Sequence, residues 1–115
     1  MSMTIDLNNL RRFVGHDPSL VRQMVLAYLR FLPENIQNIK LALLNKDNET
    51  LLREIHQLKP NLMNIGVQLE SLTFEELYQK LKAEGITPIN EQLLCEAVHI
   101  TERTIGLLQQ ELNEK

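Results

Sequence analysis

The sequence predicts an all-α protein, an antiparallel four-helix bundle with a short extra helix at the N-terminus. Apolar residues recur every three or four positions along almost the whole chain, which is the spacing of amphipathic helices. Aromatic residues make up only 4% of the chain, and no Val/Ile/Thr-rich stretch alternates apolar with polar side chains as strands do. Four substantial helical segments joined by short connections pack as a bundle.

The composition indicates a single cytoplasmic domain that spans residues 1–115. A chain of 115 residues, 43% hydrophobic and 23% charged, is typical of one soluble globular domain. The net charge of −3 and the scattered basic residues argue against a nucleic-acid partner. One cysteine excludes an internal disulfide and fits a reducing compartment. The start of the chain lacks a signal-peptide pattern, and no apolar stretch approaches the roughly 20 residues of a membrane span.

The short first helix is expected over residues 6–14. Gly15 is its stop signal, because glycine readily takes the left-handed conformation that ends helices. Asp17 and Pro18 then open the second helix. The aspartate is a preferred N-cap, and proline fits the first helical position, where its missing N–H leaves no bond unmade.

The second helix is predicted to be one long, kinked helix that runs through Pro33. Its apolar stripe keeps the same register on both sides of this proline, which frees the carbonyl of Leu29. The stripe consists of Val21, Val25, Tyr28, Leu32, Ile36, Ile39 and Leu43. Residues 45–48 are expected to form the turn that follows.

The third helix is predicted over residues 49–65, with Gly66 as its stop. At about 100° per residue, one narrow sector of this helix is apolar and is expected to be buried. That sector consists of Leu51, Ile55, Leu58, Leu62 and Ile65. His56 lies roughly 140° from the centre of the sector and is therefore expected to face solvent or a partner. The same exposed side carries Glu49, Leu52, Arg53, Lys59, Pro60 and Met63.

The fourth helix has two possible starts, Val67 or Thr73, and ends at Glu84 before Gly85. The later start is marked by capping-box spacing between Thr73 and Glu76. The last helix opens at Thr87-Pro88. Its apolar stripe consists of Leu93, Leu94, Ala97, Val98, Thr101, Ile105, Leu108 and Leu112.

The residues around His56 suggest a docking surface around a reactive imidazole. An exposed neutral imidazole is a nucleophile, and Lys59, one turn further along, places a cation where a phosphoryl group needs its charge balanced. Pro60 lies inside the helix, at a cost of about 3 kcal/mol, and removes the hydrogen bond to the His56 carbonyl. Leu52 and Met63 add apolar area. The open alternative is an incidental surface histidine beside an unrelated lysine.

The run Ile55-His56-Gln57-Leu58-Lys59-Pro60, followed by Ile65-Gly66, resembles the histidine-containing phosphotransfer (HPt) domain family. The family pattern is His-x-Leu-Lys-Gly, with an apolar residue and a glycine at the end of the same helix. The resemblance extends over about the whole chain, because the Asp17-Pro18 opening, the long second helix and the turn before the histidine helix also match.

The resemblance implies a phosphorelay function. A phosphorylated aspartate of a receiver domain would pass its phosphoryl group to Nε2 of His56, which would later pass it to another receiver aspartate. Lys59 would stabilise the phosphate, and Leu52, Arg53, Pro60 and Met63 would contact the partner, together with facing residues of the second helix. The receiver would supply the Mg²⁺, so the chain needs no cofactor of its own. We expect a monomeric phosphocarrier that is not itself an enzyme, either a standalone protein or a domain of a larger kinase.

Two positions depart from the family pattern. Pro60 stands where the family most often has glycine, and Leu69 and Glu70 do not continue the usual apolar spacing after Gly66. Proline is compact, so a receiver still has access to the imidazole, but the freed His56 carbonyl could reorient the ring. These departures bear on transfer rate and partner choice more than on the fold.

Other functions have weaker signals. The chain has no glycine-rich phosphate loop of a kinase. Glu96 and His99 form a Glu-x-x-His, but a diiron bundle needs two such pairs, so we expect no metal site and assign His99 to the surface. His16 is a loop residue before the N-cap, and Cys95 is an incidental thiol. A helical adaptor, or an inactive HPt-like protein that only binds partners, remains the alternative.

Overall fold

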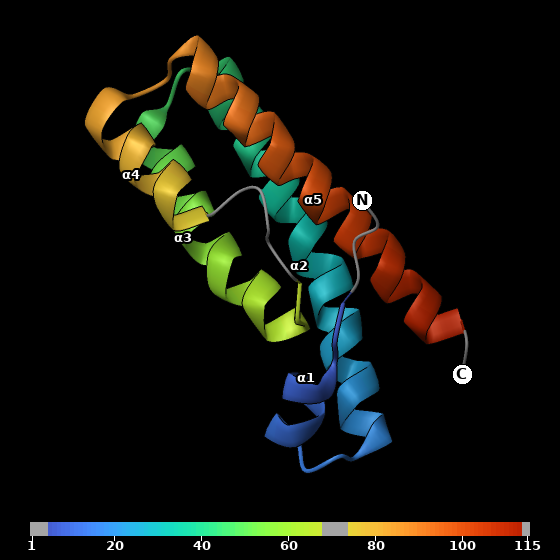
Figure 1. The fold of residues 1–115 in the computed structure, drawn as a ribbon. Helices are drawn as coiled ribbons and strands as arrows, with labels where there is room; N and C mark the ends of the chain where they lie inside the picture. Colours follow the sequence, from blue (N-terminus) through green and yellow to red (C-terminus); the bar gives the residue numbers. More distant parts are fainter. Residues whose placement is uncertain (1–4, 68–73, 114–115) are drawn as a thin grey trace.

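The computed structural model describes residues 5–67 and 74–113, and every regular element in these two ranges is a helix. There are five helices within this part of the chain (Figure 1): α1 (Asn8–Phe13), α2 (Pro18–Leu44), α3 (Asn48–Ile65), α4 (Phe74–Glu84) and α5 (Pro88–Asn113). The predicted all-helical fold class is thus confirmed for the described residues. None of these helices combines the length and the apolar character needed to cross a membrane.

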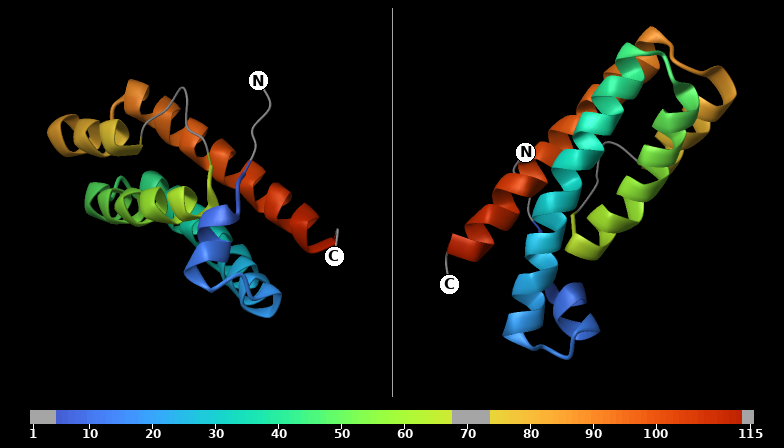
Figure 2. Two further views of the ribbon diagram at one scale, coloured as in Figure 1. Left: turned by 60° about the horizontal axis from the view of Figure 1, so that its bottom comes forward. Right: turned by 180° about the vertical axis from the view of Figure 1, so that it is seen from behind.

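Each of the four larger helices packs on two of the others. Helix α2 packs against α3 and α5, and α4 packs against α3 and α5 from the other side. The views in Figures 1 and 2 agree that α2 and α5 run side by side in opposite directions and that α3 returns antiparallel to α2. The short α1 contacts α2 and α3 at the end of the molecule where α3 finishes.

The core lies between these helices and contains the predicted apolar face of α3. All five residues of that face are fully buried: Leu51, Ile55, Leu58, Leu62 and Ile65. Helix α2 adds Leu32 and Ile39, and α4 and α5 add Phe74, Leu77, Leu81, Leu94 and Leu108. At about 25 cal/mol per Å² of apolar area, this burial is the main term that stabilises the fold. The sequence periodicity therefore identified the core side of α2, α3 and α5.

Helices α1 and α2 begin in different ways. Helix α1 is shorter than predicted: its N-cap is Leu7, which makes no side-chain cap bond, and Asp6 lies before it, where the Asp6 carboxylate accepts the backbone N–H of Asn8 at 3.0 Å. Asp17 is the N-cap of α2, as predicted, since its carboxylate accepts the N–H of Ser19 at 2.9 Å. Helix α2 then continues through Pro33 to its end, also as predicted.

Both ends of α3 are set by specific residues. The predicted turn is one residue too long, because Asp47 caps the helix and α3 already begins at Asn48. At the other end Gly66 has φ 83°, the left-handed conformation that a helix-ending glycine adopts. A Cβ at Gly66 would overlap the backbone of Asp6, which crosses this end of the helix. Gly66 is therefore needed both for its conformation and for close packing.

Helix α4 is held at its C-terminal end by two asparagine side chains. Asn48, at the start of α3, donates to the Leu81 carbonyl at 3.2 Å. Asn90, near the start of α5, donates to the carbonyls of Gly85 at 2.8 Å and Lys80 at 3.5 Å. The Leu81 carbonyl also accepts the backbone N–H of Gly85 at 2.9 Å, so the bond from Asn48 is a second one to that oxygen. Together the two asparagines tie the C-terminal end of α4 to both neighbouring helices.

The predicted limits of α4 and α5 are partly confirmed. The helix does not start at Val67, which is not helical, and the alternative start at Thr73 lies outside the described residues. Helix α4 ends at Glu84, as predicted, and α5 begins at Pro88. The predicted stripe of α5 is buried or partly buried along its whole length.

Candidate functional site

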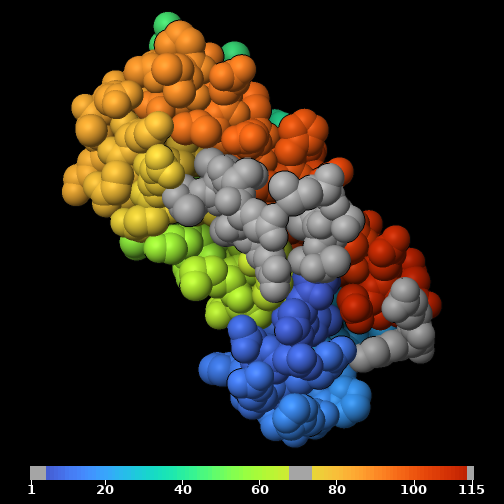
Figure 3. Space-filling model, in the orientation of Figure 1, coloured from blue at the N-terminus to red at the C-terminus, as the bar shows by residue number. Residues whose placement is uncertain are grey.

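The candidate site is centred on His56, which lies on the exposed side of α3 as predicted. Its imidazole is packed beside the ring of Tyr78 on α4, with ring centroids 5.4 Å apart and ring planes inclined by 45°. Tyr78 is itself partly buried against the core, so it forms a fixed wall on one side of the imidazole. On the face shown in Figure 3, part of α3 is exposed between α4 and α1.

Lys59, one turn after His56, forms an ion pair that the sequence did not predict. Its Nζ lies 3.2 Å from Oε2 of Glu75 on α4, and the two side chains are 39% and 54% exposed. Lys59 is therefore already paired with a carboxylate when His56 carries no phosphoryl group. Its charge is shared with a carboxylate of the neighbouring helix.

Glu75 is anchored on both carboxylate oxygens. Gln79, one turn along α4, donates to Oε1 at 3.1 Å, while Lys59 donates to Oε2. The hydrogen bond from Gln79, the bond and charge of Lys59, and the nearby charge of His56 together lower the pKa of the Glu75 carboxyl. The site thus combines an imidazole, an ammonium and an ionised carboxylate from two helices. The spacing of Glu75, Tyr78 and Gln79 on one face of α4 is the signal that could have indicated this side of the site.

The predicted partner contacts on α3 are exposed with one exception. Arg53 and Pro60 are exposed, and Met63 is 55% exposed although it is a large apolar side chain. Leu52 was predicted to lie on the exposed surface, but it is only partly exposed and packs against the core. The reason is its direction: Leu52 lies about 100° from Leu51 around the helix, on the side of α3 from which Lys59 reaches α4.

Helix α4 lies beside the imidazole through Tyr78, a neighbour that the sequence did not predict. The side of α3 that faces α2 carries Glu54, which is buried and was not predicted to be. Oε1 of Glu54 accepts hydrogen bonds from Asn38 at 2.7 Å and Asn35 at 3.4 Å, both on α2. Glu54 and His56 are two residues apart and hence point in directions about 160° apart around the helix.

A second apolar surface lies near the last turn of α3. A hollow of about 310 Å³ is lined by Asn9, Leu10, Phe13, Met24, Tyr28 and Asn64, from α1, α2 and α3. Phe13 is 83% exposed at its edge.

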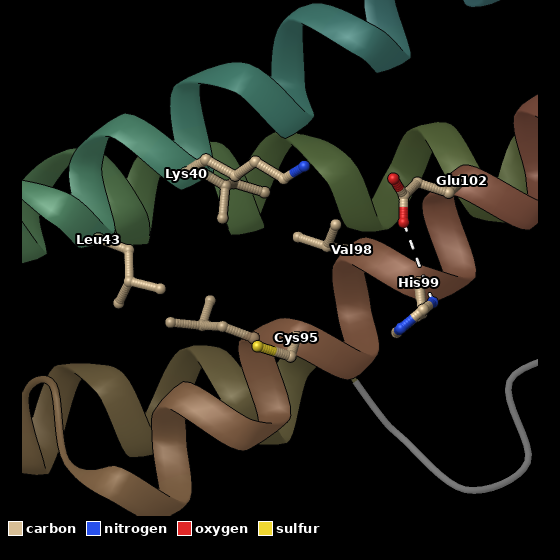
Figure 4. A pocket seen from close by; sticks show the side chains of 8 residues that line it. Lys40, Leu43, Cys95, Val98, His99 and Glu102 are labelled. Carbon is tan, nitrogen blue, oxygen red and sulfur yellow. Dashed lines mark ion pairs between the residues drawn. The ribbon is translucent and has the colours of Figure 1, made fainter.

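The other two histidines lie away from this site. His99 is exposed and its Nδ1 is 3.9 Å from the Glu102 carboxylate, at the rim of a hollow of about 240 Å³ between α2 and α5 (Figure 4). The exposed Cys95 lines the same hollow. His16 lies in the turn between α1 and α2, as predicted, with φ 62°. In residues 5–67 and 74–113, no three His, Cys, Asp or Glu side chains are grouped to hold a metal ion.

Comparison of the chain with protein-family models, with curated proteins and with solved structures found no match.

Proposed function

We propose that this protein is a histidine phosphotransfer protein of a two-component phosphorelay. Its four larger helices would form the antiparallel bundle of that family, with α1 as the short extra helix. The observation that carries the proposal is an exposed imidazole, His56, one turn from the Lys59 ammonium, on a helix whose opposite face is fully buried. The left-handed Gly66 that ends the same helix supports the resemblance of the whole motif.

The proposed transfer needs little covalent chemistry from the chain. The lone pair on Nε2 of neutral His56 forms the N–P bond, and the P–O bond to the receiver aspartate breaks. The electron pair of that bond leaves with the carboxylate, and the ring proton stays on Nδ1. The reverse sequence delivers the phosphoryl group to another receiver. Positioning and charge stabilisation dominate such a reaction. Lys59 supplies charge from this side, and the receiver supplies Mg²⁺ and its acidic pocket.

The surface around His56 suits a docking partner. Arg53, Pro60 and Met63 are exposed beside it on α3, and Leu52 adds its partly exposed edge. We propose receiver domains as the partners of a monomeric protein that works in the cytoplasm. An exposed free thiol, Cys95, fits a reducing compartment of this kind.

The second candidate function is an adaptor, or an inactive HPt-like protein, that binds partners without carrying phosphate. The Lys59–Glu75 ion pair favours this alternative, because the cation that a phosphoryl group needs is already partnered. Pro60, in place of the usual glycine of the family pattern, also favours this alternative.

Phosphorylation of the purified chain distinguishes the two functions. The protein is incubated with phosphoramidate, and separately with a panel of phosphorylated receivers, and its intact mass is recorded. We expect an acid-labile gain of one phosphoryl group in the wild type and in His99→Gln, a matched exposed histidine on α5. His56→Gln should show no gain while keeping its helical circular-dichroism spectrum. A folded wild-type protein that gains no phosphoryl group from any donor would establish the adaptor or inactive alternative.

A further inference from the structure

We propose that Glu75 is a positioning residue that competes with the phosphoryl group on His56 for the Lys59 ammonium. This inference rests on the proposed phosphotransfer function and names the residue that tunes it. In the unphosphorylated protein Glu75 holds Lys59, and phosphorylation of His56 requires the ammonium to leave the carboxylate.

The geometry makes Glu75 the fixed partner and Lys59 the movable one. Gln79 binds Oε1 of Glu75 from the same helix at 3.1 Å, so the carboxylate keeps its place when Lys59 moves. Lys59 has a long, flexible side chain and reaches Oε2 from the opposite helix at 3.2 Å. The imidazole packs against Tyr78, which is one turn from Glu75 on α4. One ammonium therefore has two possible anionic partners.

The competition has a consequence for the phosphorylated state. Once a phosphoryl dianion is attached to Nε2, Lys59 pairs with it, and the Lys59–Glu75 ion pair is broken. The loss of this attraction raises the free energy of phosphohistidine relative to the free imidazole. The phosphoryl group is then held less tightly and is more readily passed to a receiver aspartate. Because the pair is solvent-exposed, the effect is a few-fold change rather than many orders of magnitude.

Four variants and phosphoramidate test the proposal. In this reaction Nε2 of His56 forms the N–P bond, the P–N bond of phosphoramidate breaks, and ammonia leaves with the electron pair. The measured quantity is the second-order rate constant of phosphorylation, followed by intact mass. Glu75→Gln keeps the acceptor for Gln79 but removes the charge, and we expect it to react about threefold faster than the wild type. Glu84→Gln removes the same charge at the end of α4, about 13 Å further along the helix, and should match the wild type.

A double-variant cycle shows whether Glu75 acts through Lys59. We expect Lys59→Gln to react more slowly than the wild type. In the Lys59→Gln background, the threefold gain from Glu75→Gln should largely disappear, since the ammonium is no longer there to be released. Unchanged helical spectra exclude a merely structural effect.

The outcomes separate this inference from the function on which it rests. A reactive wild type in which Glu75→Gln reacts no faster overturns the role of Glu75 and leaves phosphotransfer intact. The same gain with and without Lys59 also overturns it, because Glu75 would then act by direct repulsion. A folded wild-type protein that does not react at all overturns both the role of Glu75 and the proposed phosphotransfer function.

Discussion

Asp47 shows how one carboxylate stabilises the helix that carries the candidate site. Its Oδ2 accepts the Thr50 hydroxyl at 2.6 Å, and its Oδ1 accepts the Thr50 backbone N–H at 3.2 Å. The bond from the Thr50 hydroxyl, then the bond from its N–H, and then the charge of Arg53 lower the pKa of the Asp47 carboxyl. The charged form is thus favoured by folding. The stability that the charged Asp47 carboxylate contributes is complete above the ordinary aspartate pKa of about 4. It is lost as the pH falls through the lowered pKa of the folded protein.

Asp47→Asn should therefore change the acid sensitivity of the protein more than its stability at neutral pH. Asparagine is about as good an N-cap as aspartate, so the free energy of unfolding at pH 7 should change little. Between pH 5 and pH 3 the wild type should lose more stability than the variant, because only the wild type must protonate this cap. Urea unfolding across this pH range measures the difference. Parallel pH profiles for the two proteins would contradict the proposed cap energetics.

Helix α3 is continuous from Asn48 to Ile65 although Pro60 lies in its interior. Proline has no N–H, so the His56 carbonyl loses its usual partner within the helix. The buried face, from Leu51 to Ile65, holds the helix together despite this loss. Tertiary packing thus outweighs the local preference of proline to end a helix.

Pro60→Ala should stabilise the protein, because it restores a backbone hydrogen bond at an exposed position. We expect the free energy of unfolding to rise by about 1–3 kcal/mol. Urea unfolding gives this value, with Pro33→Ala in α2 as a second exposed interior proline for comparison. A loss of stability in Pro60→Ala would mean that the proline fits a local distortion of α3 that alanine does not favour.

The arrangement of the whole molecule depends on how α4 is held between α3 and α5. Asn48 binds the Leu81 carbonyl and Asn90 binds the Gly85 carbonyl just after the helix. The α4 residues Phe74, Leu77 and Leu81 are buried in the core. This attachment sets the place of Glu75 and Tyr78 opposite α3. The geometry of the candidate site is therefore a property of the assembled helices and not of α3 alone.

Asn90→Ala should loosen α4. Asn90 is fully buried, and its amide nitrogen is the donor to Gly85 and Lys80. Removal of this buried amide deletes the donor to the Gly85 carbonyl and the link from α5 to the end of α4, so we expect a loss of about 1–2 kcal/mol in the free energy of unfolding. Asn90→Asp, which has the same shape but places acceptors against these carbonyls, should lose more. Amide hydrogen exchange should increase first in α4. Equal stability of both variants and the wild type would show that the asparagine does not tie α4 in place.

Much of the fold was predictable because it is decided by residues within one or two helical turns. The caps at Asp17 and Gly66, the buried stripe of α3 and the exposure of His56 all depend on positions a few residues apart. Helical periodicity relates such positions directly. The sequence by itself therefore determined which segments are helices, which side of α2, α3 and α5 is buried, and that His56 and Lys59 are neighbours on one helix.

Only the tertiary structure decided what lies opposite these residues. Lys59 and Glu75 are 16 residues apart in the chain, and Glu54 and Asn35 are 19 apart. Helical spacing carries no information on such pairs, because they depend on how α2, α3 and α4 are rotated and placed against one another. For the same reason α4, and not α2, provides the wall beside the imidazole. The ion pair that occupies Lys59 arises from packing between helices.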